Sequence, residues 1–334
     1  MATSKKQTPS VKASVKNLPK TLVSDKTAEK PSVGFIGLGI MGSAMSMNLH
    51  QAGFHVYGFD PSPQQQKLMK KAGIDIQASV SDVAAKASHI LLSLPSVAAL
   101  LSVAQDIANS AKKGTIVAEL GTLPGEAKEA AREILAKKNM TLLDCPLSGT
   151  GAQAKTKDLV VYASGDKKAI TQMDAVFNGF ARAIYNIGEF GQGMKMKLVA
   201  NHLVAIHNVA SAEAILLGVQ MGLDANQIVE VIGNSAGSSR MFQVRGPSMA
   251  NRTWGEATMK IDVWNKDMHL ISGAIESYAV PAPVFASCIP VYNAANALGH
   301  AKDDTAVVYK VLENWSTPMP KKTSAKKLNK KSKK

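Results

Sequence analysis

The sequence predicts an α/β protein in which an N-terminal Rossmann-type, doubly wound sheet is followed by a long connecting helix and an all-α C-terminal domain. From Ser32 to Gly188, short apolar runs rich in β-forming residues alternate with stretches of helical spacing. This alternation is typical of parallel strands whose sheet is covered by helices on both faces. From Met194 to Met221 the chain has no proline and no glycine before Gly218, which predicts one helix roughly 40 Å long.

Each element follows from a local pattern of apolar residues bounded by Gly, Pro or Ser. The predicted strands read SVGFIGLG, HVYGFD, HILLSLP, TIVAEL, MTLLDCP and LVVYASGD, and a shorter helix and a last strand end near Gly188. The predicted helices read MGSAMSMNLHQAG, PSPQQQKLMKKAG, SDVAAKA, SVAALLSVAQDIANSAKK and PGEAKEAAREILAKKN. These boundaries predict a nucleotide-binding domain over residues 32–192 and a helical substrate and oligomerisation domain over 193–316.

The net charge of +14 is concentrated at the two ends of the chain. Residues 1–31 hold seven Lys against Asp25 and Glu29, and residues 316–334 hold eight Lys and no acid. Both tails are rich in Lys, Ser, Thr and Pro, and we expect them to be disordered. The part between them is close to neutral, so nucleic-acid binding is expected at most weakly, through the tails.

Composition narrows the compartment and the class of protein. No apolar stretch is expected to reach the roughly 18 residues that span a bilayer, and no secretory signal is expected. Two cysteines, Cys145 and Cys288, are too few for a disulfide framework and lie in apolar contexts, so buried free thiols are expected. A cytoplasmic location fits these features, with a nuclear or mitochondrial one as the alternative.

A glycine motif follows the first predicted strand and opens the first predicted helix. In Gly37-x-Gly39-x-x-Gly42, the first glycine suits a tight turn, the second a close approach of backbone to a pyrophosphate, and the third close helix–strand packing. Asp60 ends the next strand, 18 residues after Gly42. Its carboxylate would accept hydrogen bonds from ribose hydroxyls and repel a 2′-phosphate, and no Arg follows it, so NAD is favoured over NADP.

Several motifs follow one another along the chain between its tails. They are GFIGLGIMGSAMSMNL with Leu38, Ile40 and Met41, then Leu94-Pro95, Thr122, DCPLSG with Ser148-Gly149, Gly191-x-Gly193-x-x-x-Lys197-x-x-x-Asn201 and Lys266-Asp267. In this order they resemble the β-hydroxyacid dehydrogenase family, which includes 3-hydroxyisobutyrate dehydrogenase and tartronate semialdehyde reductase. The resemblance runs from about residue 33 to residue 315 and leaves out both tails.

The resemblance implies a role for each motif. Leu94, Pro95 and Thr122 would border the cofactor, Ser148 and Gly149 would bind the substrate carboxylate, and Lys266 would lie in the cleft near the cofactor. Lys197 would be the catalytic acid/base and Asn201 would hold the substrate. The two lie four residues apart, and on a helix they therefore project from one face.

Oxidation of a hydroxy acid needs a hydride acceptor, which the cofactor supplies, and a proton acceptor from the protein. For Lys197 to accept a proton near neutral pH, its pKa must fall from about 10.4 towards about 7–8, a differential stabilisation of about 3–5 kcal/mol. Burial in an apolar helix acts in that direction. In the reductive direction the protonated lysine would serve as the acid.

Three departures from the family pattern bear on the substrate more than on the reaction. Thr150 replaces the second glycine of the Ser-Gly-Gly signature, Ala200 stands where relatives usually carry Asn, and Ala99 where some have Asn near the cofactor. Thr150 therefore counts among the candidate substrate contacts. Arg240, in SSRMF, is a further candidate contact for a carboxylate.

Three other functions are compatible with a fold of this kind. 6-Phosphogluconate dehydrogenase normally has Lys-x-x-His-Asn, whereas position 200 is Ala, and imine reductases usually replace the lysine that Lys197 retains. A non-catalytic nuclear protein on this fold would explain the Lys-rich tails. The sequence favours an NAD(P)-dependent dehydrogenase of a small 3-hydroxy acid or its semialdehyde, active as a homodimer or homotetramer, with no metal site and no membrane contact.

Overall fold

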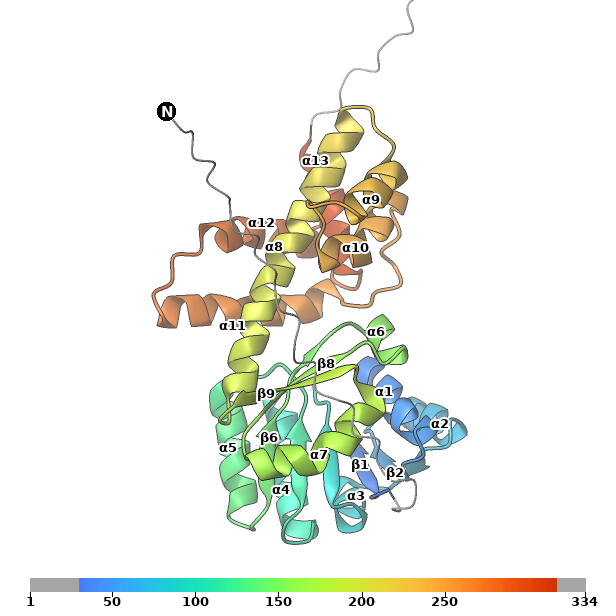
Figure 1. The fold of residues 1–334 in the computed structure, drawn as a ribbon, viewed down its shortest axis with the longest axis vertical. Coiled ribbons are helices and arrows are strands. Elements are labelled where there is room, and N and C mark those ends of the chain that lie inside the picture. The colour runs from blue at the N-terminus through green and yellow to red at the C-terminus, as the bar shows by residue number, and fades with distance from the viewer. Residues whose placement is uncertain (1–29, 317–334) are drawn as a thin grey trace, which may run out of the picture. The chain divides into compact units, whose positions relative to one another are not determined.

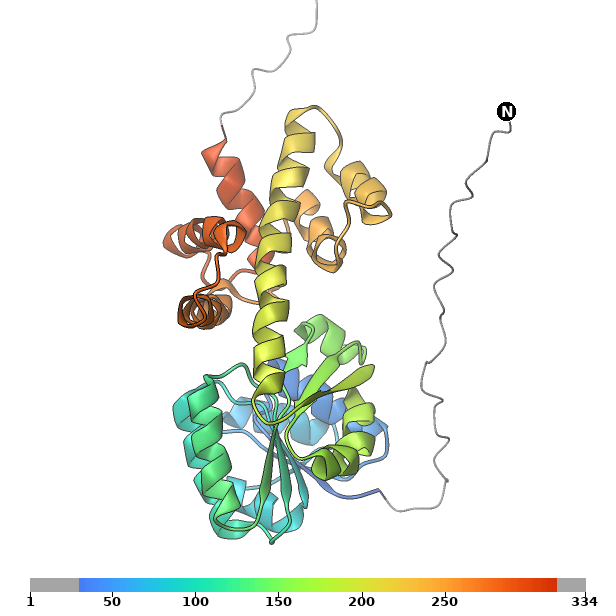
Figure 2. The ribbon, with the colours of Figure 1, turned by 60° about the vertical axis from the view of Figure 1, so that its left-hand side comes forward.

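The computed structural model describes residues 30–316. The predicted disorder of both tails concerns segments that lie almost entirely outside the described residues. Within these, a Rossmann-type sheet with its helices is followed by the long helix α8 and a group of helices (Figures 1 and 2). The predicted fold class is therefore confirmed.

The described residues form one nine-stranded sheet with the order β3-β2-β1-β4-β5-β6-β8-β7, and β9 pairs with β8. The strands are β1 Val33–Ile36, β2 Val56–Phe59, β3 Asp75–Ile76, β4 His89–Leu92, β5 Ile116–Glu119, β6 Thr141–Asp144, β7 Leu147–Ser148, β8 Val160–Ser164 and β9 Ala183–Gly188.

Seven helices accompany the strands within the described part of the chain. They are α1 Ile40–Gln51, α2 Pro63–Lys71, α3 Val80–Lys86, α4 Val97–Ser110, α5 Gly125–Ala136, α6 Gly151–Lys155 and α7 Lys167–Phe180. Side chains of Ser62, Ser79, Ser96 and Asp166 accept a backbone N–H at the first turn of α2, α3, α4 and α7, as N-cap residues do. One apolar core lies between the sheet and α1 with α7, and a second lies under α3, α4 and α5.

The expectation of a wholly parallel sheet is wrong at one edge. Strands β1 to β6 are parallel, but β8 runs antiparallel to β6 and β7. The link between β6 and β8 holds only the two-residue β7 and the five-residue α6. Neither element is long enough to cover the sheet as the helix of a parallel crossover does, and the chain returns as a reversed neighbour.

The C-terminal half is helical from Gln192 onwards. Its elements are α8 Gln192–Gln220, α9 Ala225–Gly233, α10 Arg240–Asn251, α11 Ile261–Ser277, α12 Pro283–Ala297, the 3₁₀ turn η1 Thr305–Val307 and α13 Val308–Trp315. Helix α8 contacts strands β6 to β9 at its start and α9 to α13 along its length. It therefore ties the sheet to a second apolar core built from the helices. Cys145 and Cys288 are both buried and unpaired, as predicted.

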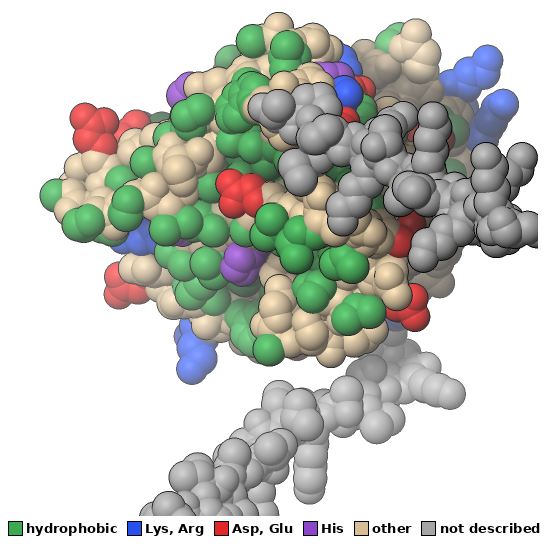
Figure 3. Space-filling model, turned by 90° about the horizontal axis from the view of Figure 1, so that it is seen from above, with side chains coloured by type: hydrophobic (Ala, Val, Ile, Leu, Met, Phe, Trp, Pro, Cys, Tyr) green, Lys and Arg blue, Asp and Glu red, His purple; other side chains and the backbone are tan. Residues whose placement is uncertain are grey.

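Helix α8 differs from its prediction in one respect. By length and composition it is apolar enough to cross a membrane, contrary to the expectation that no stretch reaches that length. Part of its apolar surface is exposed, at Met196, Val199, Leu203 and Leu217. Apolar side chains also gather on the surface at the helical end of the molecule (Figure 3).

Candidate active site

The glycine motif adopts a turn that side chains would block at two of its three positions. Gly37 has a positive φ of 91°, and a Cβ there would lie 2.2 Å from the carbonyl oxygen of Ser93. A Cβ on Gly42 would lie 1.9 Å from the carbonyl oxygen of Gly37. At Gly39 nothing lies within 4 Å of a built Cβ. The first and third glycines are needed for the fold, whereas the second keeps space open.

That open space belongs to a cavity of about 780 Å³. The turn forms one wall, the loops after β2 and β4 form the next, and residues 257–260 of the helical region face them. The first turn of α1 borders the cavity, and the N–H groups of the first turn of a helix lack partners within the helix, which suits phosphate. The predicted cofactor residues that line the cavity are Gly37, Gly39, Ile40, Met41, Asp60, Leu94 and Pro95.

Asp60 is held at the end of β2 by two backbone N–H groups. Its Oδ2 accepts from Leu38 N at 2.7 Å and its Oδ1 accepts from Ser62 N at 2.9 Å. Because each carboxylate oxygen has two lone pairs, both oxygens keep capacity for a further donor in the cavity. The Leu38 side chain is fully buried in the core, so Leu38 contributes to the predicted cofactor site only through its backbone N–H, which orients Asp60.

Lys197 and Asn201 lie on the second and third turns of α8 and are both buried, at 8% and 4% exposure. Asn201 Nδ2 donates to Asp267 Oδ2 of α11 at 2.9 Å. Among the described residues the Lys197 amine has no hydrogen-bond or ion-pair partner. Burial lowers the pKa of Lys197, the charge of Lys266 lowers it further, and attraction by Asp267 offsets only part of this. The amine can therefore lose its proton more readily than an exposed lysine.

Lys266 connects α11 to the sheet. Its Nζ donates to the carbonyl oxygen of Thr122 and lies 3.2 Å from Asp267 Oδ1. Thr122 follows β5, and a Cβ on the neighbouring Gly121 would lie 3.4 Å from the carbonyl oxygen of Leu94, which borders the cavity. Thr122, Lys197 and Lys266 do not line the cavity. The contacts of Lys266 with Thr122 and Asp267, and of Asp267 with Asn201, join the loop after β5 to the part of α8 that carries Lys197.

The start of α8 requires its own glycines. Gly191 has a φ of +87°, and a Cβ on Gly193 would lie 2.4 Å from the carbonyl oxygen of Tyr162 and 2.7 Å from that of Asp144. The helix thus begins in close contact with β6 and β8, and this fixes where Lys197 emerges one turn later.

The segment Ser148 to Thr150 leads from β7 into α6. Ser148 is partly exposed at the end of β7, and Gly149 has a φ of +137°. Thr150 is the N-cap of α6 and forms a capping box with Gln153. Thr150 lines the large cavity and also a neighbouring polar cavity of about 340 Å³.

Arg240 lies on that second cavity, where its guanidinium is committed to an ion pair. Arg240 Nη2 lies 2.8 Å from Asp158 Oδ2, and Arg182 binds the other oxygen of the same carboxylate. Its side chain is largely exposed. Arg240 therefore links α10 to the segment just before β8. Among the described residues, no hydrogen bond or ion pair joins it to Lys197, Asn201 or Asp267.

Sequence reasoning missed the buried ion pairs of Lys128 with Glu119 and Asp144. Lys128 of α5 is fully buried between Glu119 of β5 and Asp144 of β6, with both Nζ–carboxylate distances at 2.6 Å. In sequence, Lys128 lies in the amphipathic stretch GEAKEAAREILA, where a lysine is usually solvated. The only available signal was that Lys128 falls on the apolar face with Ala131 and Leu135.

Comparison with known proteins identifies the family. Residues 32–188 match the NAD binding domain of 6-phosphogluconate dehydrogenase, and residues 191–312 match the family described as NAD-binding of NADP-dependent 3-hydroxyisobutyrate dehydrogenase. L-threonate dehydrogenase of Haemophilus influenzae is 30% identical over 292 residues, which are 86% of this chain and 97% of that protein. The chain belongs to the β-hydroxyacid dehydrogenase family.

Other members of the family extend the comparison. 2-(Hydroxymethyl)glutarate dehydrogenase of Eubacterium barkeri is 28% identical, with 85% of this chain and 95% of that protein covered. The crystal structure of 3-hydroxyisobutyrate dehydrogenase from Salmonella typhimurium has a TM-score of 0.77 at 26% identity, with 84% and 100% covered. As a member of this family, the protein is an NAD(P)-dependent oxidoreductase acting on hydroxy acids, and this confirms the predicted reaction class.

Proposed function

We propose that this β-hydroxyacid dehydrogenase uses Lys197 as the acid/base of the reaction. The observation that carries the proposal is a buried amine on the second turn of α8, near the Asp267–Lys266 pair, that has no partner within residues 30–316. In oxidation the neutral amine accepts the proton of the substrate hydroxyl, and in reduction the ammonium returns it. Asn201, oriented by Asp267, is in place to hold the reacting oxygen.

The open position at Gly39 and the cavity beside it fit a dinucleotide. The N–H groups at the start of α1 would hold its phosphates and Asp60 its ribose hydroxyls, and a bound nicotinamide supplies hydride exchange. We propose a preference for NAD over NADP. Asp60 supports it, because its carboxylate would repel a 2′-phosphate, and the residues that follow, Pro61, Ser62 and Pro63, bring no cation.

We further propose a hydroxylated four-carbon acid of the threonate type as the substrate. The relative named L-threonate dehydrogenase supports this choice. The polar cavity next to Thr150 supports it as well, since Ser248, Thr253 and Thr258 line it and can bind substrate hydroxyls. Ser148 and Gly149 would receive the carboxylate at the end of β7.

Steady-state kinetics over a pH range would test the cofactor, the substrate and the acid/base together. We expect kcat/KM for L-threonate to exceed that for 3-hydroxyisobutyrate at least tenfold, and NAD to be used better than NADP. Because the pKa of Lys197 is lowered, oxidation should rise and reach its plateau below the pH at which an ordinary lysine deprotonates. Reduction needs the ammonium and should fall over the same pH range. A flat pH profile in both directions would contradict the lysine mechanism.

We propose that a second copy of the chain covers the exposed apolar face of α8. Val199 of α8 lines one groove with Tyr278 and Val280, which follow α11, and all three are exposed. The same helix carries the buried polar residues Lys197 and Asn201, which favours a protein partner over lipid as its cover. Sedimentation equilibrium should give the mass of a dimer or tetramer, and Val199→Glu should shift it towards the monomer. A wild-type monomer at micromolar concentration would contradict the proposal.

A further inference from the structure

The buried cluster of Lys128, Glu119 and Asp144 is unusual in a protein interior because charges lose hydration there. A buried ion pair is rarely better for stability than well-packed apolar side chains of similar volume. Burial lowers the pKa of Lys128, but attraction by the two carboxylates outweighs this and raises it overall. Lys128 is therefore a buried cation, and its contacts show which parts of the chain it holds in place.

The first contact is with the loop after β5. Lys128 Nζ donates to the carbonyl oxygen of Gly121 at 2.8 Å, and Glu119 Oε1 accepts from the N–H of Gly121 at 2.7 Å. Both polar groups of this glycine are thus held by the cluster. The next residue is Thr122, whose carbonyl oxygen receives Lys266.

The second contact is with the first turn of α8. Asp144 pairs with Lys128 through Oδ1, and its Oδ2 accepts from Met194 N at 2.8 Å. Ser164 Oγ accepts from Gly193 N at 2.9 Å and donates to the carbonyl oxygen of Asp144 at 3.0 Å. A carboxylate at a helix N-terminus is also favoured by the helix dipole. The turn held in this way lies three residues before Lys197.

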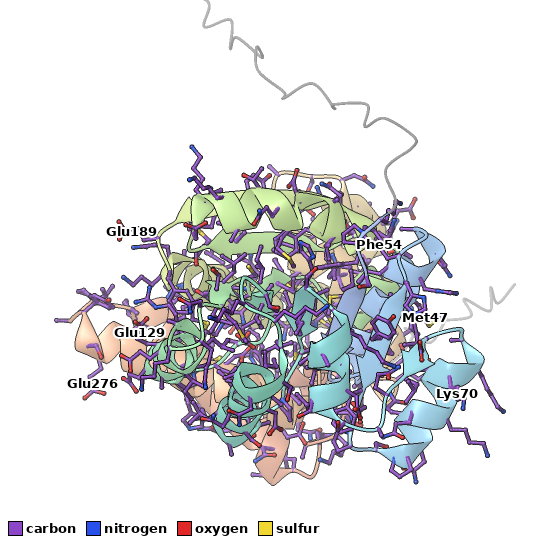
Figure 4. The ribbon with its side chains drawn as sticks, turned by 90° about the horizontal axis from the view of Figure 1, so that it is seen from below. Met47, Phe54, Lys70, Glu129, Glu189 and Glu276 are labelled. Carbon is purple, nitrogen blue, oxygen red and sulfur yellow. The ribbon has the colours of Figure 1, made fainter. Side chains whose placement is uncertain are left out.

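The outer side of α5 is packed against the same region. The guanidinium of Arg132 lies 5.0 Å from the ring centroid of Phe190, in the loop between β9 and α8. Glu129 of α5 and Glu189 of that loop line one surface cavity and lie on the same side of the molecule in Figure 4. Helix α5 is therefore linked to the start of α8 through Asp144 inside the protein, and it meets the loop before α8 at the surface.

We propose that Lys128 is a positioning residue that holds the Thr122 loop and the Lys197 turn at a fixed separation. The proposal rests on the function proposed for Lys197. Lys128 contacts neither the cavity nor Lys197, and it acts through Gly121 and Asp144. Since a displacement of about 1 Å at a reacting group can lower a rate by about 10²-fold, loosening this tie should affect kcat and leave the glycine turn unchanged.

The test is the double variant Glu119→Gln/Lys128→Met. It removes one formal positive and one formal negative charge, so the formal charge of the cluster is unchanged, and the side-chain amide introduced at position 119 retains an acceptor for Gly121 N. We expect kcat to fall at least tenfold. The Kd for NADH, measured without substrate, should stay within threefold of the wild-type value. Amides of residues 193–194 should exchange hydrogen for deuterium at least tenfold faster. The matched control is Leu135→Ala, which opens a cavity on the same face of α5 and should lower stability but leave kcat within twofold.

The outcomes separate this proposal from a purely structural role and from the proposed function. A folded double variant with kcat within twofold of wild type overturns it, even if amide exchange becomes faster. If the double variant does not fold, Glu119→Gln alone decides, because it keeps the Lys128–Asp144 pair and removes only the carboxylate that Lys128 faces on β5. We expect kcat to fall threefold to tenfold there, and an unchanged kcat overturns the proposal. Turnover that survives the loss of the Lys197 amine would instead overturn the proposed function.

Discussion

Replacing Lys197 by alanine should reduce kcat in both directions by about 10²–10⁴-fold, the range that general acid–base catalysis contributes. The amine has no partner among the described residues, so its removal breaks no hydrogen bond there. The substitution also removes the free-energy cost of burying a charged amine. The fold and the binding of NADH should therefore be kept. Initial rates, NADH titration and thermal unfolding of the same preparation would measure the three quantities.

Two further variants make this result specific. Lys195→Ala removes an exposed lysine two residues earlier on α8 and should leave kcat within twofold. Lys197→Arg keeps a positive charge that does not deprotonate in proteins, so it should be as inactive in oxidation as the alanine variant. An active Lys197→Ala enzyme, or an active arginine variant with an unchanged pH profile, would show that another group transfers the proton.

The features predicted from sequence are those that depend on neighbouring residues. The turn at Gly37 and the strand ending at Asp60 are set by local backbone requirements, and the long helix after Gly191 by the absence of breakers. The short β7 and α6 were not predicted, since two and five residues carry too little periodicity. The reversed direction of β8 follows from that unpredicted link.

The features that escaped prediction depend on contacts across long sequence separations. Asn201 and Asp267 form a hydrogen bond although 66 positions separate them in the sequence. Asp144, the partner of Lys128, accepts a hydrogen bond from Met194, which lies 50 positions later at the start of α8. Nothing local in the sequence around Lys128 indicates that its partners are Glu119 and Asp144. The composition of α8 likewise shows that the helix is apolar, but not which face other helices leave uncovered.

Replacing Gly39 by threonine should weaken NADH binding at least 100-fold with little change in stability. The backbone of Gly39, at φ −64° and ψ −159°, suits an L-residue, and threonine serves about as well as glycine at a helix N-cap. A Cβ at this position would have no atom of the described residues within 4 Å, so the new side chain enters the cavity. If the turn holds a pyrophosphate, the methyl and hydroxyl groups of threonine occupy the space that its close approach requires.

The matched control is Gly125→Ala, at the first position of α5, where a Cβ also meets nothing within 4 Å. It lies outside the cavity and should leave the Kd for NADH unchanged, with the melting temperature equal or slightly raised, because alanine has the higher helix propensity. Fluorescence titration with NADH and thermal unfolding of both variants provide the comparison. Equal affinity in Gly39→Thr and wild type would mean that the cofactor binds away from the glycine turn. The acid/base role proposed for Lys197 would then lose its support as well, because it needs a nicotinamide bound at this turn.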